Sequence, residues 1–317
     1  MRIPEIQTVA CLGAGTMGHG IAFLAAKAGY TVRLFGRSQQ SLDKGMAGVE
    51  RAIALYEAHQ LMPANQGASL KKRIIPVTSV EEAADGADLI LESVAEDLHI
   101  KQKTFSIAER HCRPEAVLAT NTSGLSLSAI GSALARPEYF LSIHFFSPPY
   151  LMSPAEISPI PATLPAIRAL SARWVKSLGN VPIELEKEVK GFIVNRIQAA
   201  CLREALHIVE QGWASAETVD KAVSLTLGRR YSVTGPIESA DMGGLDIFNS
   251  VLEHICPVLG TRVEAGPLMD KALQSGRLGM KSGNGLYAWP PETISARRAA
   301  REQSLIGFMQ QDMEDKA

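Results

Sequence analysis

His144 and Glu156 are the side chains of this sequence whose types and spacing best suit acid–base chemistry. His144 lies near the end of an apolar run, 140–145, that is typical of a buried strand, and Glu156 lies in the strand-like segment 155–157. The residues Pro148-Pro149-Tyr150 between them can turn the chain back, so that the two side chains meet. Histidine can take the hydroxyl proton when a carbinol loses hydride, and a carboxylate can orient the imidazole and stabilise its cation. At this point, a core histidine with one satisfied hydrogen bond is an equally good interpretation.

A glycine-rich segment near the N-terminus predicts a dinucleotide site. Gly13, Gly15 and Gly18 form a GxGxxG pattern that follows a strand-like run and opens a helix. The first glycine permits a tight turn, the second lets the backbone approach a pyrophosphate, and the third lets helix and strand pack closely. The helix N-terminus, with Thr16 and Met17 in its first turn, would then hold the anion. Glycine-rich turns are common, so the prediction depends on the alternating strands and helices around the motif.

The residues after the second predicted strand bear on which dinucleotide is bound. Enzymes that use NAD place an acidic side chain about twenty residues after the glycine motif, where it binds the ribose hydroxyls. This sequence has Gly36 there, followed by Arg37 and Ser38. Glycine removes the repulsion of a 2′-phosphate, and a guanidinium with a hydroxyl can bind one. We therefore expect NAD(P)(H) as the cofactor, with a preference for NADP(H). An NAD enzyme with a solvated Arg37 is the alternative.

Short apolar runs separated by helical stretches must position these residues. The runs lie at 8–12, 31–35, 74–77, 89–91, 117–119, 140–145 and 181–185, at intervals that leave room for crossover helices. Strands joined in this way pair in parallel, and ligands bind at the edge where their carboxyl ends meet. The sequence therefore predicts an α/β fold with a Rossmann-type dinucleotide-binding domain, and it places His144 at the ligand-binding edge.

The periodicity changes from strands to helices after residue 188. Apolar residues recur at helical spacing in 192–209, 218–227, 246–259 and 268–273. We expect residues 1–188 to form the dinucleotide-binding domain, with a helical insertion at 41–73. Residues 189–317 are expected to form an all-helical C-terminal domain for substrate binding and dimerisation. The tail beyond Pro290-Pro291 is predicted to be a polar, solvated helix, with packing at a subunit contact as the alternative.

Composition excludes several classes of partner. The 317 residues carry a formal net charge of −1, and the longest basic cluster is only Lys71-Lys72-Arg73. A nucleic-acid site needs a basic face, and a membrane span needs about eighteen consecutive apolar residues; the sequence has neither. The 4 cysteines are scattered without a CxxC pattern, so neither a zinc site nor a disulfide framework is predicted. The N-terminal segment shows no signal-peptide core. We expect a cytoplasmic enzyme without a metal, acting on a small molecule.

Six ordered motifs resemble the 3-hydroxyacyl-CoA dehydrogenase family. The first, from His144-Phe145-Phe146-Ser147 to Glu156-Ile157, is similar to that family's signature. The others lie at 87–98 with Lys101, at 120–126, at 191–196, at 235–246 and at 281–287. The resemblance runs in one order from about residue 6 to about residue 289.

The resemblance implies roles for individual residues. His144 would be the acid–base group and Glu156 its partner, while Ser123 and Asn195 would hold the reacting oxygen and the nicotinamide region. Cofactor contacts would include Glu96, Lys101, Asn121, Ser147 and Lys281. The helical domain would form most of a homodimer interface and close over the substrate. Taken without the family, Ser123 could be a turn hydroxyl, Asn195 a polar residue at a helix start, and the two lysines solvated charges.

Departures from the family pattern bear on the substrate. Members that act on long CoA thioesters carry a serine and a lysine on the helical insertion, which grip the nucleotide end of CoA. The matching positions here are Ala52 and His59. Ser147 replaces the asparagine of the signature. Segments 147–150, 188–198 and 227–231 are similar to the gulonate and carnitine dehydrogenase branch, whose members oxidise free hydroxy acids. Arg229 or Arg230 could then pair with a substrate carboxylate, or simply complete a basic helix end.

These features predict hydride transfer between a 3-hydroxyacyl-CoA, or a related 3-hydroxy acid, and NAD(P); a thioester substrate would place the enzyme in fatty-acid metabolism. An alternative keeps the same site but uses a non-CoA substrate, either a free hydroxy acid or an aldehyde on a carboxylated ring, oxidised as its hydrate. A more remote alternative is a dinucleotide-binding protein without catalysis. The His144–Glu156 pair argues against it, because a protein that only binds needs no acid–base pair.

Overall fold

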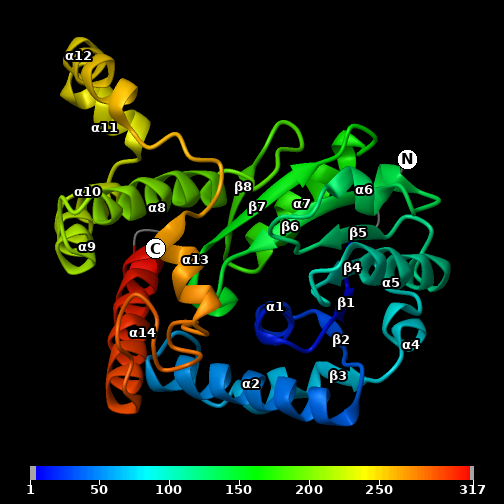
Figure 1. The fold of residues 1–317 in the computed structure, drawn as a ribbon. Coiled ribbons are helices and arrows are strands. Elements are labelled where there is room, and N and C mark those ends of the chain that lie inside the picture. The colour runs from blue at the N-terminus through cyan, green and yellow to red at the C-terminus, as the bar shows by residue number, and fades with distance from the viewer. Residues whose placement is uncertain (1–4, 315–317) are drawn as a thin grey trace. The chain divides into compact units, whose positions relative to one another are not determined.

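The computed structural model describes residues 5–314 and contains an eight-stranded sheet (Figure 1). Its strands are β1 (Thr8–Leu12), β2 (Thr31–Phe35), β3 (Ile74–Val77), β4 (Leu89–Glu92), β5 (Val117–Thr120), β6 (Phe140–Phe145), β7 (Pro154–Pro159) and β8 (Val181–Glu184). Their order across the sheet is β3-β2-β1-β4-β5-β6-β7-β8. Neighbours pair in parallel except β6 and β7, which form an antiparallel hairpin. The chain reverses its direction of winding between β1 and β4, and ligands bind at such a switch point in open α/β sheets.

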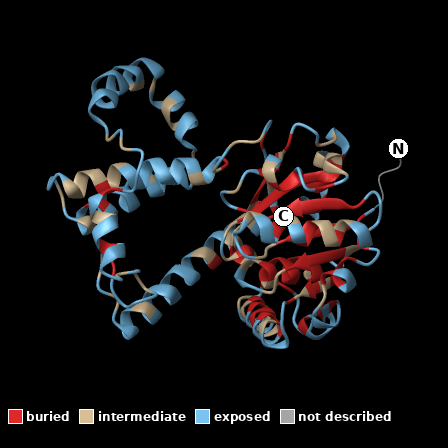
Figure 2. Ribbon diagram, turned by 45° about the vertical axis from the view of Figure 1, so that its right-hand side comes forward, coloured by how far each residue is buried: buried red, intermediate tan, exposed pale blue. Residues whose placement is uncertain are grey.

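Helices cover both faces of the sheet, because its inner strands are apolar on both sides. On one face, α1 (Thr16–Lys27), α2 (Gln39–Ala58) and α7 (Pro165–Ser177) share a core that includes Ile21, Val49 and Ile167. On the other face, α4 (Val80–Ala84), α5 (Leu98–His111) and α6 (Leu127–Gly131) share a core that includes Phe105 and Ile130. Figure 2 shows this buried centre in red. Every predicted apolar run forms a strand, and the Rossmann-type fold is confirmed.

The segment predicted as an insertion, 41–73, is helical and consists of most of α2 together with α3 (Gly67–Lys72). Helix α2 is capped by Ser38, whose Oγ accepts a hydrogen bond from Ser41 N at 3.2 Å and so satisfies one of the free amides of the first turn. Its buried face includes Val49, Ala52 and Tyr56, which pack in the same core as α1. The insertion is therefore anchored on the sheet by apolar contacts.

Residues Val194–Ala299 form a second compact unit. Its elements are α8 (Val194–Glu210), α9 (Ala216–Leu225), α10 (Leu227–Tyr231), α11 (Pro236–Gly243), α12 (Leu245–Ile255), the short η3 (Cys256–Val258) and α13 (Pro267–Gln274). The apolar side chains buried in this unit are Leu206, Val219 and Ala272 alone. The helical character of the C-terminal region is as predicted, but the unit has a thin core of its own.

The last helix, α14 (Pro291–Glu314), departs from the prediction of a solvated tail. From Ala300 onward its residues belong to the first compact unit, which otherwise ends at Ile193. Ile306 is 1% exposed, and Leu305 and Met309 pack on the core shared by α1, α2 and α7. The three apolar residues recur at helical spacing within a polar segment, and so form a narrow apolar stripe. The predicted division into 1–188 and 189–317 differs from these units mainly in the place of this tail.

Two general properties follow from the described residues. Within 5–314, none of the helices combines the length and the apolarity that a bilayer crossing needs. The cysteines are all free thiols, and no group of three or more His, Cys, Asp or Glu side chains in the same range is arranged to hold a metal ion.

Candidate active site

His144 and Glu156 face each other across the β6–β7 hairpin. The antiparallel register pairs the two residues directly, which places their side chains on the same face of the sheet at short range. His144 Nδ1 lies 2.9 Å from Glu156 Oε2, and the two residues are only 3% and 0% exposed. The side chains therefore meet as the sequence analysis expected. A carboxylate that accepts from Nδ1 leaves Nε2 as the acceptor nitrogen of a neutral imidazole.

The Nε2 atom of His144 faces Ser123. Ser123 follows β5 and is exposed, and its Oγ lies 3.2 Å from Nε2. The three side chains form a row of orienting carboxylate, base and hydroxyl. An alcohol oxygen placed beside Ser123 Oγ would be within reach of both the hydroxyl and the imidazole. Among the predicted site residues, the structure brings these three into direct contact.

The chain returns to this pair at Phe192 and Ile193, to which the sequence analysis gave no site role. The ring centroid of Phe192 lies 5.2 Å from that of His144, and Ile193 N donates to Glu156 Oε1 at 2.9 Å. Phe192 has a φ of 50°, in the left-handed region that is costly for a bulky residue. Glu156 thus orients His144 with one oxygen and holds the following chain with the other. Gly191, with its own φ of 81°, is the one sequence signal of a turn here.

The glycine motif fits the pyrophosphate of a dinucleotide. Gly13 has a φ of 123°, and a Cβ on it would lie 2.6 Å from the carbonyl oxygen of Ser93. A Cβ on Gly18 would overlap the carbonyl oxygen of Gly13. A Cβ on Gly15 would meet nothing within 4 Å, and Gly15 is the N-cap of α1 without a capping side chain. Open space above an uncapped helix start is what an approaching phosphate needs.

A buried hydroxyl that the sequence analysis missed lies beside this turn. Ser93 Oγ is buried and has no hydrogen-bond partner among the described residues. A buried hydroxyl without a partner is costly, so a polar group of a bound cofactor is a suitable occupant. Thr16 and Met17 form the first turn of the adjoining helix α1. Ser93 follows β4 directly, so only its place at a carboxyl strand end could have drawn attention to it.

The end of β2 is shaped by the start of α2. A Cβ on Gly36 would lie 2.6 Å from Ser41 Oγ and 2.8 Å from Leu42 Cγ, so a larger side chain there would require these two side chains to shift. The hydroxyl of Ser38 caps α2. Arg37 is exposed and makes no hydrogen bond or ion pair with any residue in 5–314. With no acidic residue in the first turn of α2, the local charge favours an anion.

Glu96 and Lys101 belong to a network of charged side chains next to the Ser123 loop, the segment 121–126 between β5 and α6. Lys101 is 1% exposed, and its Nζ lies 2.7 Å from Glu92 Oε1 and 3.2 Å from Glu96 Oε2. Glu96 Oε1 accepts from Ser123 N at 3.2 Å and from the Thr122 hydroxyl. Burial opposes ionisation of Glu96, but the Thr122 bond and the Lys101 ammonium outweigh it and lower the pKa. The predicted cofactor contacts of Glu96 and Lys101 stay predictions; the structure shows that both also support the Ser123 loop.

The remaining predicted contacts are spread over both units. Asn121 Oδ1 accepts from Phe145 N at 2.8 Å and so ties the end of β5 to the end of β6, while Ser147 is exposed just beyond β6. Asn195 lies in the first turn of α8, and Lys281 lies in an exposed turn of the second unit. Their predicted roles stay predictions.

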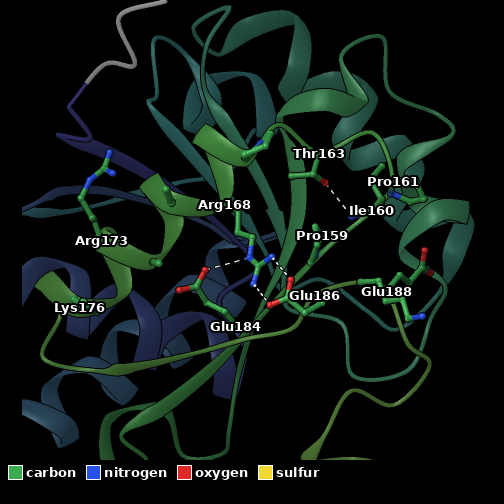
Figure 3. Close-up of a pocket in the computed structure, with 14 residues that line it drawn as sticks. Pro159, Ile160, Pro161, Thr163, Arg168, Arg173, Lys176, Glu184, Glu186 and Glu188 are labelled. Carbon is green, nitrogen blue, oxygen red and sulfur yellow. Dashed lines mark hydrogen bonds and ion pairs between the residues drawn. The ribbon is translucent and has the colours of Figure 1, made fainter.

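A hollow of about 870 Å³ beside α7 and β8 is separate from these residues (Figure 3). Arg168 crosses it and pairs with Glu184 at 3.1 Å and with Glu186 at 3.2 Å. None of the predicted site residues lines this hollow, and its central cation is already neutralised. We therefore give it no part in the reaction.

Two family models together match nearly the whole chain. The model described as 3-hydroxyacyl-CoA dehydrogenase, NAD binding domain, matches residues 8–189, and the model of the C-terminal domain matches residues 191–289. The chain belongs to the 3-hydroxyacyl-CoA dehydrogenase family. The resemblance inferred from the ordered motifs is confirmed, and the chain is a member of an NAD-dependent oxidoreductase family. Residues 290–317 lie beyond both family models.

Relatives by sequence act on different kinds of substrate. The 3-hydroxybutyryl-CoA dehydrogenase of Clostridioides difficile is 33% identical over 281 residues, which are 88% of this chain and 98% of that protein. The 5-formyl-3-hydroxy-2-methylpyridine 4-carboxylate 5-dehydrogenase of Mesorhizobium japonicum is 29% identical over 305 residues, 95% of this chain and 96% of that protein. Membership of the family therefore does not decide between a CoA thioester and a free ring acid.

Solved structures differ in how much of the chain they match. A crystal structure of the pyridine-aldehyde dehydrogenase, described as an NAD⁺-dependent dismutase, is 28% identical with a TM-score of 0.91 and covers 98% of this chain and 99% of its own. The 3-hydroxybutyryl-CoA dehydrogenase of Escherichia coli K12 is 32% identical with a TM-score of 0.76 and covers 90% of this chain and 60% of its own. The first match necessarily includes most of residues 290–317.

Proposed function

We propose that this chain oxidises an alcohol, or a hydrated aldehyde, on a small free carboxylic acid, with NAD(P) as cofactor and His144 as the base. The C-terminal helix is the observation that carries the choice of a free acid over a CoA thioester. The full-length likeness to the pyridine-aldehyde dehydrogenase supports the same choice. This is the alternative that the sequence analysis left open, now preferred to a 3-hydroxyacyl-CoA.

The three contacting side chains would share the proton chemistry. His144 Nε2 would take the proton of the reacting hydroxyl, while Glu156 holds Nδ1 and balances the charge of the imidazolium. Ser123 Oγ would hold the same oxygen, because it lies 3.2 Å from Nε2. When bound, the nicotinamide supplies the acceptor for the hydride that leaves the carbon. For an aldehyde substrate the hydrate loses one hydride and one proton, which leaves the carboxylic acid.

Helix α14 contacts the end of the helical insertion at His59, which argues against binding of a CoA nucleotide there. Ala52, at the position of a CoA-binding serine in thioester-specific relatives, is 0% exposed and faces the core. At the position of the lysine, His59 uses its carbonyl oxygen to accept a hydrogen bond from Gln310 of α14 at 3.3 Å. Ser153 Oγ donates to Asp312 of the same helix at 2.8 Å. Neither position offers the permanent cation that a lysine provides for a phosphate.

We further propose that the Gly36-Arg37-Ser38 turn leads the enzyme to prefer NADP(H) over NAD(H). The free guanidinium of Arg37 and the start of α2, which has no acidic residue in its first turn, would both attract a 2′-phosphate. Arg37→Ala should weaken NADPH binding by roughly tenfold or more and leave NADH binding nearly unchanged, because NADH lacks that phosphate. Titration of cofactor fluorescence measures both affinities without a substrate.

The substrate is tested by following the absorbance of reduced cofactor with purified protein. A carboxylated aromatic aldehyde, a free 3-hydroxy acid and acetoacetyl-CoA are compared, each with both cofactors. We expect turnover with a free acid and roughly hundredfold slower turnover with acetoacetyl-CoA. Rapid oxidation by acetoacetyl-CoA would instead support the thioester activity of the relative that is 33% identical. His144→Asn is the control: it should lower turnover by about a hundredfold or more while cofactor binding survives. Cofactor binding without any turnover would favour a noncatalytic binder.

We also propose that a second copy of this chain covers the helical unit. Helix α12 has no buried residue, and five of its six apolar side chains are each at least 47% exposed: Leu245, Ile247, Val251, Leu252 and Ile255. An exposed apolar helix face of this kind is unusual on a monomer and typical of an interface. The homodimer implied by the family resemblance is consistent with this surface.

A further inference from the structure

Glu92 and Lys101 form a buried ion pair that the proposed proton chemistry does not use. Glu92 is the last residue of β4, and the two residues are 0% and 1% exposed. Their Oε1 and Nζ atoms lie 2.7 Å apart. Burying two charges costs more than their attraction returns unless their remaining hydrogen-bonding groups are also satisfied. The buried Glu92–Lys101 pair is therefore better explained by the residues that it holds in place than by a contribution to the stability of the fold.

The Glu92 carboxylate is fixed by bonds to both of its oxygens. Oε1 also accepts from Val94 N at 2.7 Å, and Oε2 accepts from the Thr120 hydroxyl at 2.7 Å. Burial raises the pKa of Glu92, and the Lys101 ammonium together with these hydrogen bonds opposes the rise. Since Thr120 ends β5, the carboxylate joins the ends of two neighbouring strands. Lys101 is thus held at a rigid point of the sheet.

Lys101 transmits this fixed position to the loop that carries Ser123. Its Nζ lies 3.2 Å from Glu96 Oε2, and Glu96 Oε1 accepts from Ser123 N at 3.2 Å and from Gly124 N at 3.3 Å. Ser123 Oγ in turn lies 3.2 Å from His144 Nε2. An unbroken series of contacts therefore runs from the end of β4 to the acid–base pair.

We propose that Glu92 is a positioning residue that acts through Lys101 and Glu96 to hold Ser123 against His144. The competing explanation is that the pair only stabilises the end of β4. That strand is already bonded to β1 on one side and β5 on the other, so its place in the sheet does not require the pair. The catalytic importance of the contact rests on the proposed function, but the contact between Ser123 and His144 can be observed without any turnover.

The experiment measures the ¹⁵N chemical shift of His144 Nε2 in histidine-labelled protein, assigned by the loss of its signal in His144→Asn. Ser123→Ala defines the shift that results when the hydroxyl contact is lost. We expect Glu92→Gln to reproduce most of that shift, because Lys101 is then held by the half-exposed Glu96 alone. The double variant Glu92→Gln, Lys101→Met should show the same His144 signal while recovering much of any loss in Tm, because it leaves no unpaired buried charge.

Asp88 supplies a matched control just before the other end of β4. It is a 2% exposed carboxylate that pairs with Arg113 at 3.1 Å and accepts from Thr8 N at 2.9 Å, and within residues 5–314 it makes no hydrogen bond or ion pair with the loop that carries Ser123. Asp88→Asn should lower Tm and leave the His144 signal unchanged. Wild-type His144 signals in both Glu92 variants would overturn the proposal. So would a wild-type signal in the double variant alone, because the effect would then come from an unpaired ammonium.

Discussion

At the scale of single residues, Glu156 does two things at once. One carboxylate oxygen orients His144. The other accepts a hydrogen bond from the backbone N–H of Ile193, the last residue of the first compact unit before the second unit begins. Phe192 lies between these contacts, with its ring on the imidazole and its backbone in the left-handed region. A bulky residue is kept in such a conformation only when its surroundings determine it, and the contacts of this segment with His144 and Glu156 are such surroundings.

The strain at Phe192 gives an unusual expected order of stability. Phe192→Ala and Phe192→Gly both remove a ring that is 2% exposed, so each should lower the free energy of unfolding by about 3–5 kcal/mol. Because φ is positive, the glycine variant should be more stable than the alanine variant by about 1 kcal/mol. Urea unfolding of the two variants gives the difference. Alanine more stable than glycine, the usual order in helices and strands, would contradict the left-handed backbone.

Glu96 should make stability depend on pH. Burial opposes its ionisation, but the bonds from Thr122 and the Lys101 ammonium lower its pKa below the usual 4.5. A carboxyl with a lowered pKa stabilises the fold above its ordinary pKa, and this contribution is lost as the pH falls through the lower value. The difference in free energy of unfolding between wild type and Glu96→Gln should therefore shrink below pH 4.5. Denaturant titrations at several pH values check this, and a constant difference would contradict it.

At the scale of elements, the β6–β7 hairpin brings His144 and Glu156 together. The sequence was sufficient to predict it, because an apolar run, a proline turn and a second short strand leave few ways to place His144 and Glu156. The parallel strands and the glycine turn were predictable for the same reason, since their signals are local. Contacts that depend on distant parts of the chain were not. The conformation of Phe192 and the packing of Ile306 depend on residues far away in sequence. A phenylalanine or an isoleucine in the sequence does not by itself indicate a left-handed backbone or a buried position in a polar helix.

The packing of α14 on the first unit can be tested by a pair of alanine substitutions. Ile306 is 1% exposed, so Ile306→Ala should lower the free energy of unfolding by about 2–4 kcal/mol through the lost apolar burial and the cavity left behind. Phe308, only two residues away, is 53% exposed, and Phe308→Ala should change it by less than about 0.5 kcal/mol. Thermal or urea unfolding distinguishes them. Equal effects would mean that the helix does not pack through this stripe.

At the scale of the whole molecule, the two compact units differ in how they bury apolar surface. The first has a core on each face of its sheet, whereas the second leaves the face of α12 exposed. Such a contrast is expected when one unit folds around its own core and the other completes its core with a partner.

The partner surface predicts a change in mass when one side chain is altered. Leu252→Lys places a charge on the exposed α12 face and should convert a dimer into a monomer, because an unpaired buried charge is not tolerated at an interface. Val263→Lys alters a side chain that is 97% exposed and outside α12, and should leave the mass unchanged. Light scattering after size exclusion measures both. A monomeric wild-type protein would contradict the proposal.

The crowded position at Gly36 restricts how this enzyme could change its cofactor. An acidic side chain there, the usual route to NAD, would require Ser41 and Leu42 to move, since a Cβ alone would lie 2.6 Å and 2.8 Å from their atoms. Ser41 also completes the reciprocal cap with Ser38 at the start of α2. Single substitutions at Gly36 would therefore loosen the helical insertion before they improved recognition of the ribose. A change of ribose recognition at this position therefore requires the cap of α2 and the end of β2 to change together.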